Sequence, residues 1–280
     1  MPVHDELGLR IKGYYEKIPQ TKLMRRCPVL LRLDGKAFHT WTQGFKKPFD
    51  EVLVKSMQDT MKYLCENIQG CVLGYTQSDE ITLVLVDYKK LNSAAWFDYE
   101  VQKLCSVAAS MCTMAFNKAF EKNAEKFIED CAIDYETEGL YGKGTPEYKL
   151  CEIYERVCNK GAMFDCRCFN IPKEEVTNCL YWRQVDATRN SIQMVGQAHF
   201  SHNELHEKKQ NDIQDMLMLQ KGINWNDFPT HLKRGSCCIK EKYHDDVYKM
   251  DKTRWIIDKE IPIFKNVGRE YIDSLIYIGE

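Results

Sequence analysis

Two aspartates in this sequence each stand next to a short apolar run, a placement that suits phosphoryl-transfer chemistry. Asp34 follows the run Val29–Leu33, and Asp79 lies between the runs Cys71–Tyr75 and Ile81–Val86. Short runs rich in leucine and β-branched residues, bounded by turn residues, indicate buried strands. If those strands are neighbours, the two carboxylates meet at one edge of a sheet. Mg²⁺ at phosphoryl-transfer sites is commonly held by one or two carboxylates together with substrate phosphates.

A simpler interpretation of each aspartate stays open on spacing alone. An Asp-Gly pair such as Asp34-Gly35 more often marks only a turn, because glycine readily adopts the positive φ that tight turns need. An acidic hairpin tip is usually a solvated loop. The hypothesis of a metal site therefore depends on the residues around the two aspartates.

Those residues resemble the catalytic half of the tRNA-His guanylyltransferase family, whose members extend RNA in the 3′-to-5′ direction. The resemblance covers roughly residues 8–240. It implies a nucleotidyltransferase built on a polymerase palm. The segments that carry the resemblance are Arg32–His39, Lys46–Asp50, Tyr75–Glu80, Trp182–Asp186 and Gly222–Asp227.

The resemblance implies a two-metal centre. Asp34 and Asp79 would hold two Mg²⁺ ions, with the backbone carbonyl of Gly35 as a further ligand. Two ions about 4 Å apart stabilise an in-line displacement, because one activates the attacking hydroxyl and the other steadies the leaving pyrophosphate. Glu80 is adjacent to Asp79, but an extended backbone points it elsewhere, so we expect a supporting role for it.

Nucleotide-binding side chains are expected around the same aspartates. Arginine can bind phosphate through two parallel hydrogen bonds, lysine acts as a mobile point charge, and a serine hydroxyl can reach a triphosphate oxygen. Taken alone, the histidine in this set is better explained as the partner of a nearby polar group. The residues assigned to nucleotide binding are Arg32, Lys36, His39, Lys47 and Ser78.

The family reaction has two phosphoryl-transfer stages that one two-metal centre can serve. ATP first activates a 5′-monophosphorylated RNA end and releases pyrophosphate. The 3′-hydroxyl of an incoming GTP or other nucleoside triphosphate then attacks the activated phosphate and expels AMP. The resemblance thus implies ATP, nucleoside triphosphates and tRNA as partners. It also implies a homotetramer formed as a dimer of dimers.

One segment departs from the pattern of the eukaryotic enzymes that add a non-templated G to tRNA-His. Where those carry His-Ile-Asn-Asn-Leu-Tyr-Asn, this chain has Thr188–Met194, and only Asn190 clearly corresponds. The departure favours family members that repair truncated tRNA 5′ ends by Watson–Crick templating. Arg183, Asp186 and Asn190 are candidates for nucleotide or RNA contacts, and so are Lys233 and Arg234 from a late basic cluster.

Three alternatives to templated repair stay open. One is G addition to tRNA-His, which differs only in substrate and template rule. A second is a palm-type nucleotidyltransferase or cyclase that acts on free nucleotides. A third is an RNA-binding protein without catalysis, which the two intact aspartates and their basic neighbours disfavour.

Composition agrees with an intracellular enzyme. The 280-residue chain is 44% hydrophobic and 29% charged, with a net charge of −2, so positive charge for RNA must be local. No apolar run approaches the length of a membrane span, and Met1–Glu6 lacks a signal pattern, so we expect a cytoplasmic protein.

The thirteen cysteines are interpreted as reduced, mostly buried thiols rather than disulfides or a zinc ribbon. Strand alternation predicts Cys166 and Cys168 on one face and the adjacent Cys237 and Cys238 on opposite faces. His199, His202 and His206 would share a helix face suited to zinc only if no new helix begins at Ser201 or Asn203.

The predicted fold is α+β: a palm-like, split β-α-β (ferredoxin-like) antiparallel sheet with helices on one side and a helical, small-sheet accessory part. We expect a catalytic core at 1–170, with an exposed excursion near 121–161 that contains a short helix around Tyr148–Val157, and an accessory region at 171–280. Helices are predicted over 5–18, from Asp50 through Leu64, within 93–125, from Pro172, over Ala187–His199 and over Glu204–Leu219. Strands are predicted at Met163–Phe169 and, as a small accessory sheet, at Arg254–Ile257 and Ile261–Phe264.

Overall fold

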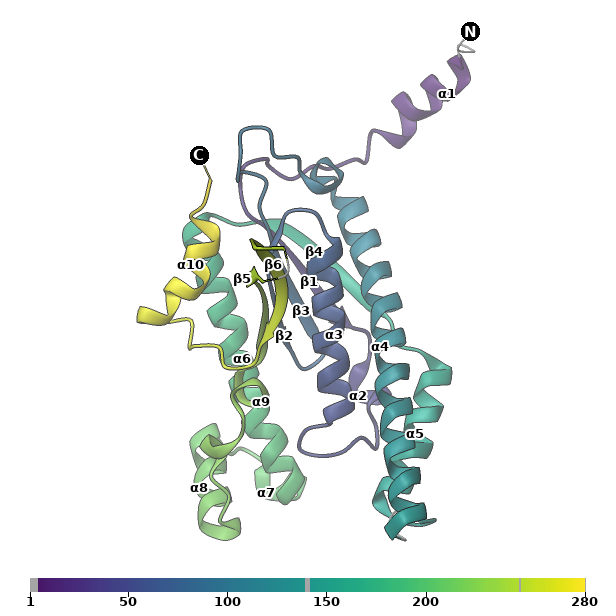
Figure 1. The fold of residues 1–280 in the computed structure, drawn as a ribbon, viewed down its shortest axis with the longest axis vertical. Helices are drawn as coiled ribbons and strands as arrows, with labels where there is room; N and C mark the ends of the chain where they lie inside the picture. The colour runs from purple at the N-terminus through teal and green to yellow at the C-terminus, as the bar shows by residue number, and fades with distance from the viewer. Residues whose placement is uncertain (1–4, 139–141, 247, 280) are drawn as a thin grey trace.

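A six-stranded antiparallel sheet forms the centre of the protein (Figure 1). The structure is a computed structural model and describes residues 5–138, 142–246 and 248–279. The strand order is β4-β1-β3-β2-β5-β6, and its first four strands have the split β-α-β arrangement of a palm. The predicted α+β, palm-like fold is confirmed. The strands are β1 (Val29–Gly35), β2 (Cys71–Gln77), β3 (Glu80–Leu85), β4 (Phe164–Asn170), β5 (Ser236–Asp245) and β6 (Met250–Asp258).

Helices between residues 38 and 160 lie on one side of the sheet. They are α2 (Phe38–Trp41), α3 (Glu51–Asn67), α4 (Val101–Glu138) and α5 (Pro146–Lys160). Asp50 begins α3 as its N-cap, since its carboxylate accepts a hydrogen bond from the Leu53 amide at 2.9 Å. An aromatic cluster lies where the end of β1 meets α2 and the start of β4, with the Trp41 and Phe120 ring centroids 4.9 Å apart.

The opposite face is covered by α6 (Lys173–His199) and α10 (Glu270–Ile276). Their apolar residues, Val176, Leu180 and Ile272 among them, pack against Leu30 and Tyr75 of the sheet. Beyond the sheet, the end of α6 packs against α8 around a small separate core. The remaining elements are α1 (Glu6–Ile11), the π-helical turn η1 (Lys12–Glu16), η2 (Trp96–Tyr99), α7 (His202–Leu205), α8 (Gln210–Lys221), η3 (Trp225–Asp227), α9 (Thr230–Arg234) and η4 (Asn266–Arg269).

Two predictions for the second half of the chain are wrong. The helices predicted from Pro172 and over Ala187–His199 are one continuous helix, α6, because the stretch contains no proline and no glycine before Gly196. The small accessory sheet is absent from the described residues: Arg254–Ile257 lies in β6, at the edge of the main sheet. Ile261 and Phe264 are buried without forming a strand, and Pro262 between them has no amide hydrogen to donate to one.

The expectation of an exposed excursion near 121–161 also needs correction. The first part of this segment continues α4 to Glu138, and the predicted short helix is confirmed as α5, Pro146–Lys160. Leu150, Tyr154 and Val157 recur at helical spacing and are buried in the catalytic core. The Tyr154 hydroxyl donates a 2.7 Å hydrogen bond to the Asp50 cap, which ties α5 to α3. The tip of the segment, residues 139–141, lies outside the described residues, and the division of domains at residue 170 stays a prediction.

The faces predicted for four cysteines and the helix break predicted near Ser201 agree with the structure, whereas only six of the thirteen cysteines are buried and the other seven are partly exposed. Cys166 and Cys168 face α4 together, whereas Cys237 and Cys238 point to opposite faces of the sheet. No disulfide joins any of the thirteen cysteines, all of which are described. Ser201 forms a capping box that begins α7, which separates His199 from His202 and His206. Among the described helices, none is long and apolar enough to cross a membrane.

Candidate active site

The end of β1 and the β2–β3 turn bring Asp34, Gly35 and Asp79 together. Asp34 lies opposite Glu80 in the antiparallel register, and the Gly35 amide donates to the Asp79 carbonyl at 3.1 Å. Leu31 and Leu33 point into the helix-covered core, so alternation presents Asp34 on the α6 face. The structure thus places the two predicted metal ligands side by side. Their role in binding metal stays a prediction.

The electrostatics of this pair suit a divalent cation. Burial raises the pKa of Asp79 above its ordinary value, and the negative charge of Asp34 raises it further. The Ser78 hydroxyl donates to Asp79 Oδ1 at 3.0 Å, which partly offsets these effects. In the described part of the chain, no group of three or more side chains forms a preassembled metal site. The two-carboxylate set therefore fits Mg²⁺ that also takes oxygens from substrate phosphates.

Asp165 is a third carboxylate at this edge, and the sequence interpretation missed it. In the β1–β4 register Asp165 stands directly opposite Asp34, so the two side chains lie on the same face of the sheet. Its side chain is 58% exposed and has only a long contact, 3.9 Å, with Arg167. The alternation of side chains in β4 shows which face Asp165 occupies. Its position next to Asp34 can be predicted only when the register between β4 and β1 is known.

Glu80 stands opposite Asp34 in the β1–β3 register, on the same face of the sheet, and a buried ion-pair network holds its carboxylate there. Arg183 Nε donates to Glu80 Oε1 at 2.8 Å, and Arg183 Nη2 donates to Asp186 at 3.0 Å. Both side chains of the Arg183–Glu80 pair are about nine-tenths buried. Arg189 completes the network by pairing with Asp186. The network ties α6 to the strand that follows the Asp79 turn, so Glu80, Arg183 and Asp186 support the site from the α6 face.

The predicted nucleotide-binding cations lie on more than one side of the site. Arg32 shares the face of Asp34, and its guanidinium carbon lies 5.8 Å from the centre of the Trp182 ring. Lys36 and His39 are exposed just beyond the end of β1. Lys47 is separate from them: it lines a polar hollow with Gln193, Gln197, His202 and His206 at the far end of α6.

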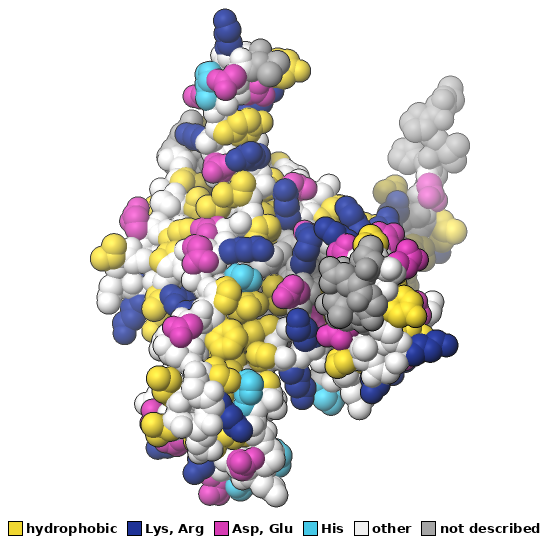
Figure 2. Space-filling model, turned by 60° about the horizontal axis from the view of Figure 1, so that its bottom comes forward, with side chains coloured by type: hydrophobic (Ala, Val, Ile, Leu, Met, Phe, Trp, Pro, Cys, Tyr) yellow, Lys and Arg dark blue, Asp and Glu magenta, His cyan; other side chains and the backbone are white. Residues whose placement is uncertain are grey.

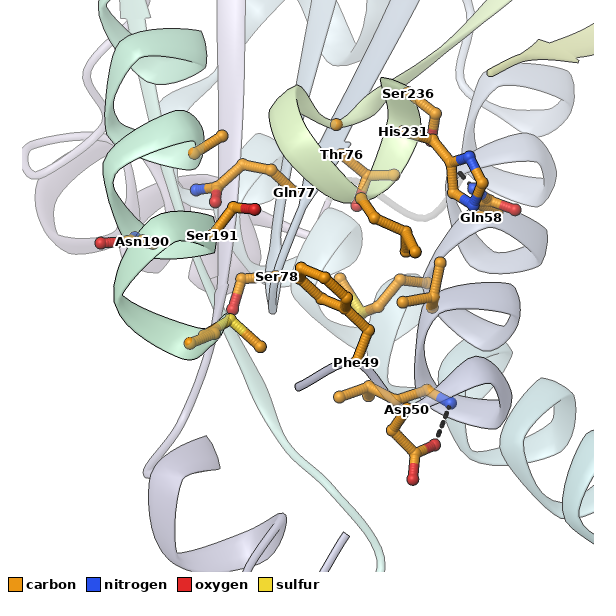
Figure 3. Close-up of a pocket in the computed structure, with 17 residues that line it drawn as sticks. Phe49, Asp50, Gln58, Thr76, Gln77, Ser78, Asn190, Ser191, His231 and Ser236 are labelled. Atoms are coloured by element: carbon orange, nitrogen blue, oxygen red, sulfur yellow. Dashed lines mark hydrogen bonds between the residues drawn. The ribbon is translucent and has the colours of Figure 1, made fainter. Parts of the chain in front are cut away.

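A pocket opens next to the Asp79 turn (Figure 3). Asn190 and Ser191 of α6 form one wall, His231 of α9 and Gln58 of α3 form the opposite wall, and Ser78 lies between them. The lining combines apolar surface with several hydrogen-bonding groups. His231 Nδ1 is buried without a hydrogen-bond partner among the described residues, and burial lowers the pKa of its imidazole, which favours the neutral ring. The apolar lining includes Phe49, Leu53, Val54, Met57, Ala187, Met194 and Leu232.

Comparison with known proteins identifies the family of this chain. The profile of the family described as tRNAHis guanylyltransferase matches residues 10–172. The chain belongs to this family.

Solved structures extend the similarity over nearly the whole chain. A bacterial tRNA(His) guanylyltransferase-like protein in complex with ATP is 38% identical, with a TM-score of 0.76 over 98% of this chain and 100% of that one. The complex of such a protein with GTP gives 36% identity and a TM-score of 0.75 over the same shares. The tRNA(His) guanylyltransferase of Saccharomyces cerevisiae is 25% identical over 233 residues, 78% of this chain and 85% of the relative.

Membership of the tRNAHis guanylyltransferase family makes the protein a nucleotidyltransferase and makes the palm edge its active-site candidate. The late basic residues are placed differently from the RNA track that we expected. Lys233 is 9% exposed and lies over the Trp225 ring, 5.6 Å from its centre, so it is part of the α9 packing. Arg234 is half-buried and remains a candidate for RNA contact.

Proposed function

We propose that the protein adds nucleotides in the 3′-to-5′ direction to the 5′ end of truncated tRNA, with the opposite strand as template. The catalytic part of the proposal rests on one observation: paired carboxylates stand beside a pocket that combines apolar walls with hydrogen-bonding groups. That lining suits a nucleobase, whose faces are apolar and whose edges are polar. The bacterial family members described above were solved with ATP and with GTP, which supports nucleotide substrates here.

The choice of templated repair rests on α6. The segment Thr188–Met194 departs from the pattern of the G-adding enzymes and contributes Asn190, Ser191 and Met194 to the pocket. Side chains that differ from those of the G-adding enzymes line the pocket next to the incoming nucleotide. The pocket would therefore not select guanine by itself. Base pairing with the RNA then supplies the selectivity.

Mg²⁺ would be held by Asp34, Asp79 and the carbonyl of Gly35. When bound, it lowers the pKa of the attacking hydroxyl and stabilises charge on the transferred phosphoryl group. The chain itself supplies the positioning. Ser78 fixes the Asp79 carboxylate through its 3.0 Å hydrogen bond, and Arg32 presents a guanidinium on the same face for phosphate.

The pocket and the surrounding surface orient the substrates. Phe49 and Met194 offer apolar contact to a base, and the Asn190 amide offers hydrogen bonds to its edge. Figure 2 shows lysine and arginine side chains along the strip between the α7–α8 lobe and the tip of α4 and α5, which suits an RNA backbone. A homotetramer and a cytoplasmic location belong to the same proposal, the latter because the many cysteines form no disulfides.

The test is an extension assay on a 5′-monophosphorylated tRNA that lacks its first nucleotide, with ATP, the four nucleoside triphosphates and Mg²⁺. The base opposite the gap is varied across all four identities. Addition of its complement in each case, lost in Asp79→Ala, is the expected result. Asp273→Ala, a change on the distant helix α10, is the control that keeps activity.

Two other outcomes would overturn the substrate assignment. If intact tRNA-His gains a G whatever base it faces, the protein is a G-adding enzyme with the same active site. If no RNA is extended but ATP or GTP is converted in an EDTA-sensitive reaction, the protein acts on free nucleotides.

A further inference from the structure

An exposed tryptophan stands beside the carboxylate pair, and the site described so far gives it no role. Trp182 of α6 is 55% exposed, and Val185, three residues further along the same helix face, is 48% exposed. The guanidinium carbon of Arg183 lies 4.6 Å from the centre of the indole ring, and that of Arg32 lies 5.8 Å from it. Arg183 is itself fixed by two largely buried ion pairs. The ring therefore has a rigid neighbour, while more than half of the residue's surface stays open.

Two arginines meet on the same face of the sheet, next to this ring. Arg32 of β1 stands directly opposite Arg167 of β4 in the antiparallel register. Like charges directly opposite one another on two strands destabilise a sheet. In the described part of the chain, the only ion pair of Arg167 is its 3.9 Å contact with Asp165, and Arg32 has no carboxylate within ion-pair distance. The pair therefore favours an anion that comes from outside the chain.

The ring and the pocket lie on opposite sides of the carboxylate pair. Trp182 lies next to Arg32 of β1, and Arg167 is on β4, the edge strand beyond β1. The pocket adjoins the end of β2, beyond β3 (Figure 3). A pocket with walls on two sides suits a free nucleotide, whereas an open surface at the edge of the sheet leaves room for a chain that continues outward. The proposed reaction needs one site of each kind, with the metal between them.

We propose that Trp182 and Arg167 hold the 5′-terminal nucleotide of the RNA substrate. The indole ring stacks on the terminal base, and the Arg167 guanidinium binds the 5′-phosphate. This inference rests on the proposed function, from which it takes the RNA. Aromatic side chains stack on unpaired bases at RNA ends, and arginine binds phosphate through two parallel hydrogen bonds.

The position of the arginine pair along its strands connects this site to the metal. Arg32 and Asp34 are two residues apart on one strand, a distance of about 7 Å, and Arg167 and Asp165 face them with the same spacing on β4. A phosphate held by Arg167 would thus border the carboxylates. Arg32 stands between the two groups and stays available to the phosphates of the nucleoside triphosphate.

The site would recognise an RNA end without reading its sequence. Stacking tolerates any base, because every base has a π-face, and a phosphate contact carries no sequence information. We therefore expect similar affinity for RNA that begins with any of the four bases, and lower affinity for RNA that lacks a 5′-phosphate.

Binding measurements without nucleoside triphosphates test the site apart from catalysis. The probe is a 5′-monophosphorylated tRNA that lacks its first nucleotide and carries a fluorophore at its 3′ end. Trp182→Ala should raise the dissociation constant about tenfold, as the loss of one base–aromatic stack does, and Trp182→Phe should recover most of the affinity. Tyr277→Ala is the matched control, because Tyr277 is 53% exposed and has a lysine near its ring, but lies after the distant helix α10. Unchanged ATP affinity verifies that each variant is folded.

Changes in the RNA locate the two contacts. Replacing the 5′-terminal base by an abasic residue should weaken binding to the wild type by a similar factor, and Trp182→Ala should then cost nothing more. Arg167→Gln should weaken binding several-fold, and removal of the 5′-phosphate should abolish that effect. Arg254→Gln, on the opposite edge strand β6, is the control for the loss of an exposed arginine.

Three results would overturn the inference. Trp182→Ala could weaken binding of the abasic RNA as much as that of the intact RNA, or Tyr277→Ala could have an equal effect. Trp182→Ala could also weaken ATP binding and leave RNA binding unchanged, which would place adenine on the ring.

Extension assays keep this test separate from that of the proposed function. If the RNA binds in the expected pattern but gains no nucleotide, the proposed reaction is wrong and the binding site stands. If templated addition occurs and the KM for RNA is the same in Trp182→Ala as in the wild type, the reaction stands and the binding site is wrong.

Discussion

Adjacent residues of β1 serve different purposes on the two faces of the sheet. Leu31 and Leu33 point into the helix-covered core and are fully buried. Arg32 and Asp34 point to the α6 face, where each retains partial exposure. On one face the strand is packed like the interior of any domain, and on the other it presents groups that can bind phosphate and metal.

This difference explains how the candidate active site can hold charged groups in a fixed arrangement. Carboxylates placed close together repel one another, and a flexible loop would let them separate. Here Asp34 extends from a strand paired on both sides, by β3 and by β4, with an apolar layer beneath it. The packed face therefore holds the charged face in place. Substitutions on the face with Asp34 should lower activity, and substitutions on the packed face should lower stability.

The largest effect is expected on activity. Asp34→Asn should lower nucleotide addition on the order of 10³-fold, as the loss of a key electrostatic group does in other active sites, with little change in the unfolding midpoint. Asp165→Asn, on the neighbouring strand, is the matched control. It should cost less than about tenfold if Asp165 only adds to the local field. Equal losses for both variants would show that Asp165 belongs to the metal set.

The buried ion pair that supports the site should have the next largest effect. Arg183→Ala leaves Glu80 charged and buried without its partner, which should lower the free energy of unfolding by about 3–5 kcal/mol. Urea denaturation measures this change. Adding Glu80→Gln should recover part of the loss, because the unpaired charge is removed. A further loss on adding it would mean that Glu80 has another partner.

A pair of neighbouring residues in β1 tests the two faces directly. Leu33→Ala should cost about 2–5 kcal/mol of stability by leaving a cavity in the core, while activity per folded molecule is largely kept. Arg32→Ala should do the reverse, with a raised KM for nucleoside triphosphate and a nearly unchanged midpoint. Calorimetry and steady-state kinetics on both variants separate the two effects. Similar changes in stability and in activity for the two variants would contradict the division between the faces.

The smallest effect is a dependence of stability on pH in metal-free buffer. Because the pKa of Asp79 is raised in the folded state, the folded protein binds a proton there more tightly than the unfolded chain does. This contribution to stability is present below the ordinary aspartate pKa, about 3.9, and is lost as pH rises through the folded value. Asp79→Asn should therefore be more stable than wild type at pH 7 and gain nothing at pH 3.

Thermal scans with Mg²⁺ complete this comparison. Magnesium should stabilise the wild type at pH 7 and have little effect on Asp79→Asn. Equal stabilisation of both proteins would place the bound ion elsewhere.

Local pattern was sufficient to predict the strands that bring Asp34 and Asp79 together, whereas their assignment to a metal site came from the family resemblance and stays a prediction. The runs before Asp34 and around Asp79 read as strands because each is short, apolar and bounded by turn residues, and β1 and β3 proved to be neighbours. The capping of α3 by Asp50 and the break at Ser201 are also local, since each depends on one side chain and the amide that follows within three residues.

Features that depend on distant partners were missed or misplaced. Asp165 gains meaning only from its register with Asp34, and His231 reaches the pocket through the placement of α9. Lys233 looks like a surface cation in the sequence, but a tryptophan and a backbone carbonyl hold it inside. The strand β6 was assigned to a separate sheet because nothing in its own residues reveals that β5 connects it to β2.

The extension of the sheet by β5 and β6 also determines which strands form its exposed edges, where another chain could add a strand. The hairpin covers the free edge of β2, so the outermost strands are β4 and β6. Asp165 and Arg167 protrude from β4, while Asp251 and Arg254 protrude from β6. Charged side chains on an outer strand disfavour the addition of a foreign strand. The charged side chains on both edge strands therefore oppose edge-to-edge aggregation of the protein, including in partly folded states during its synthesis.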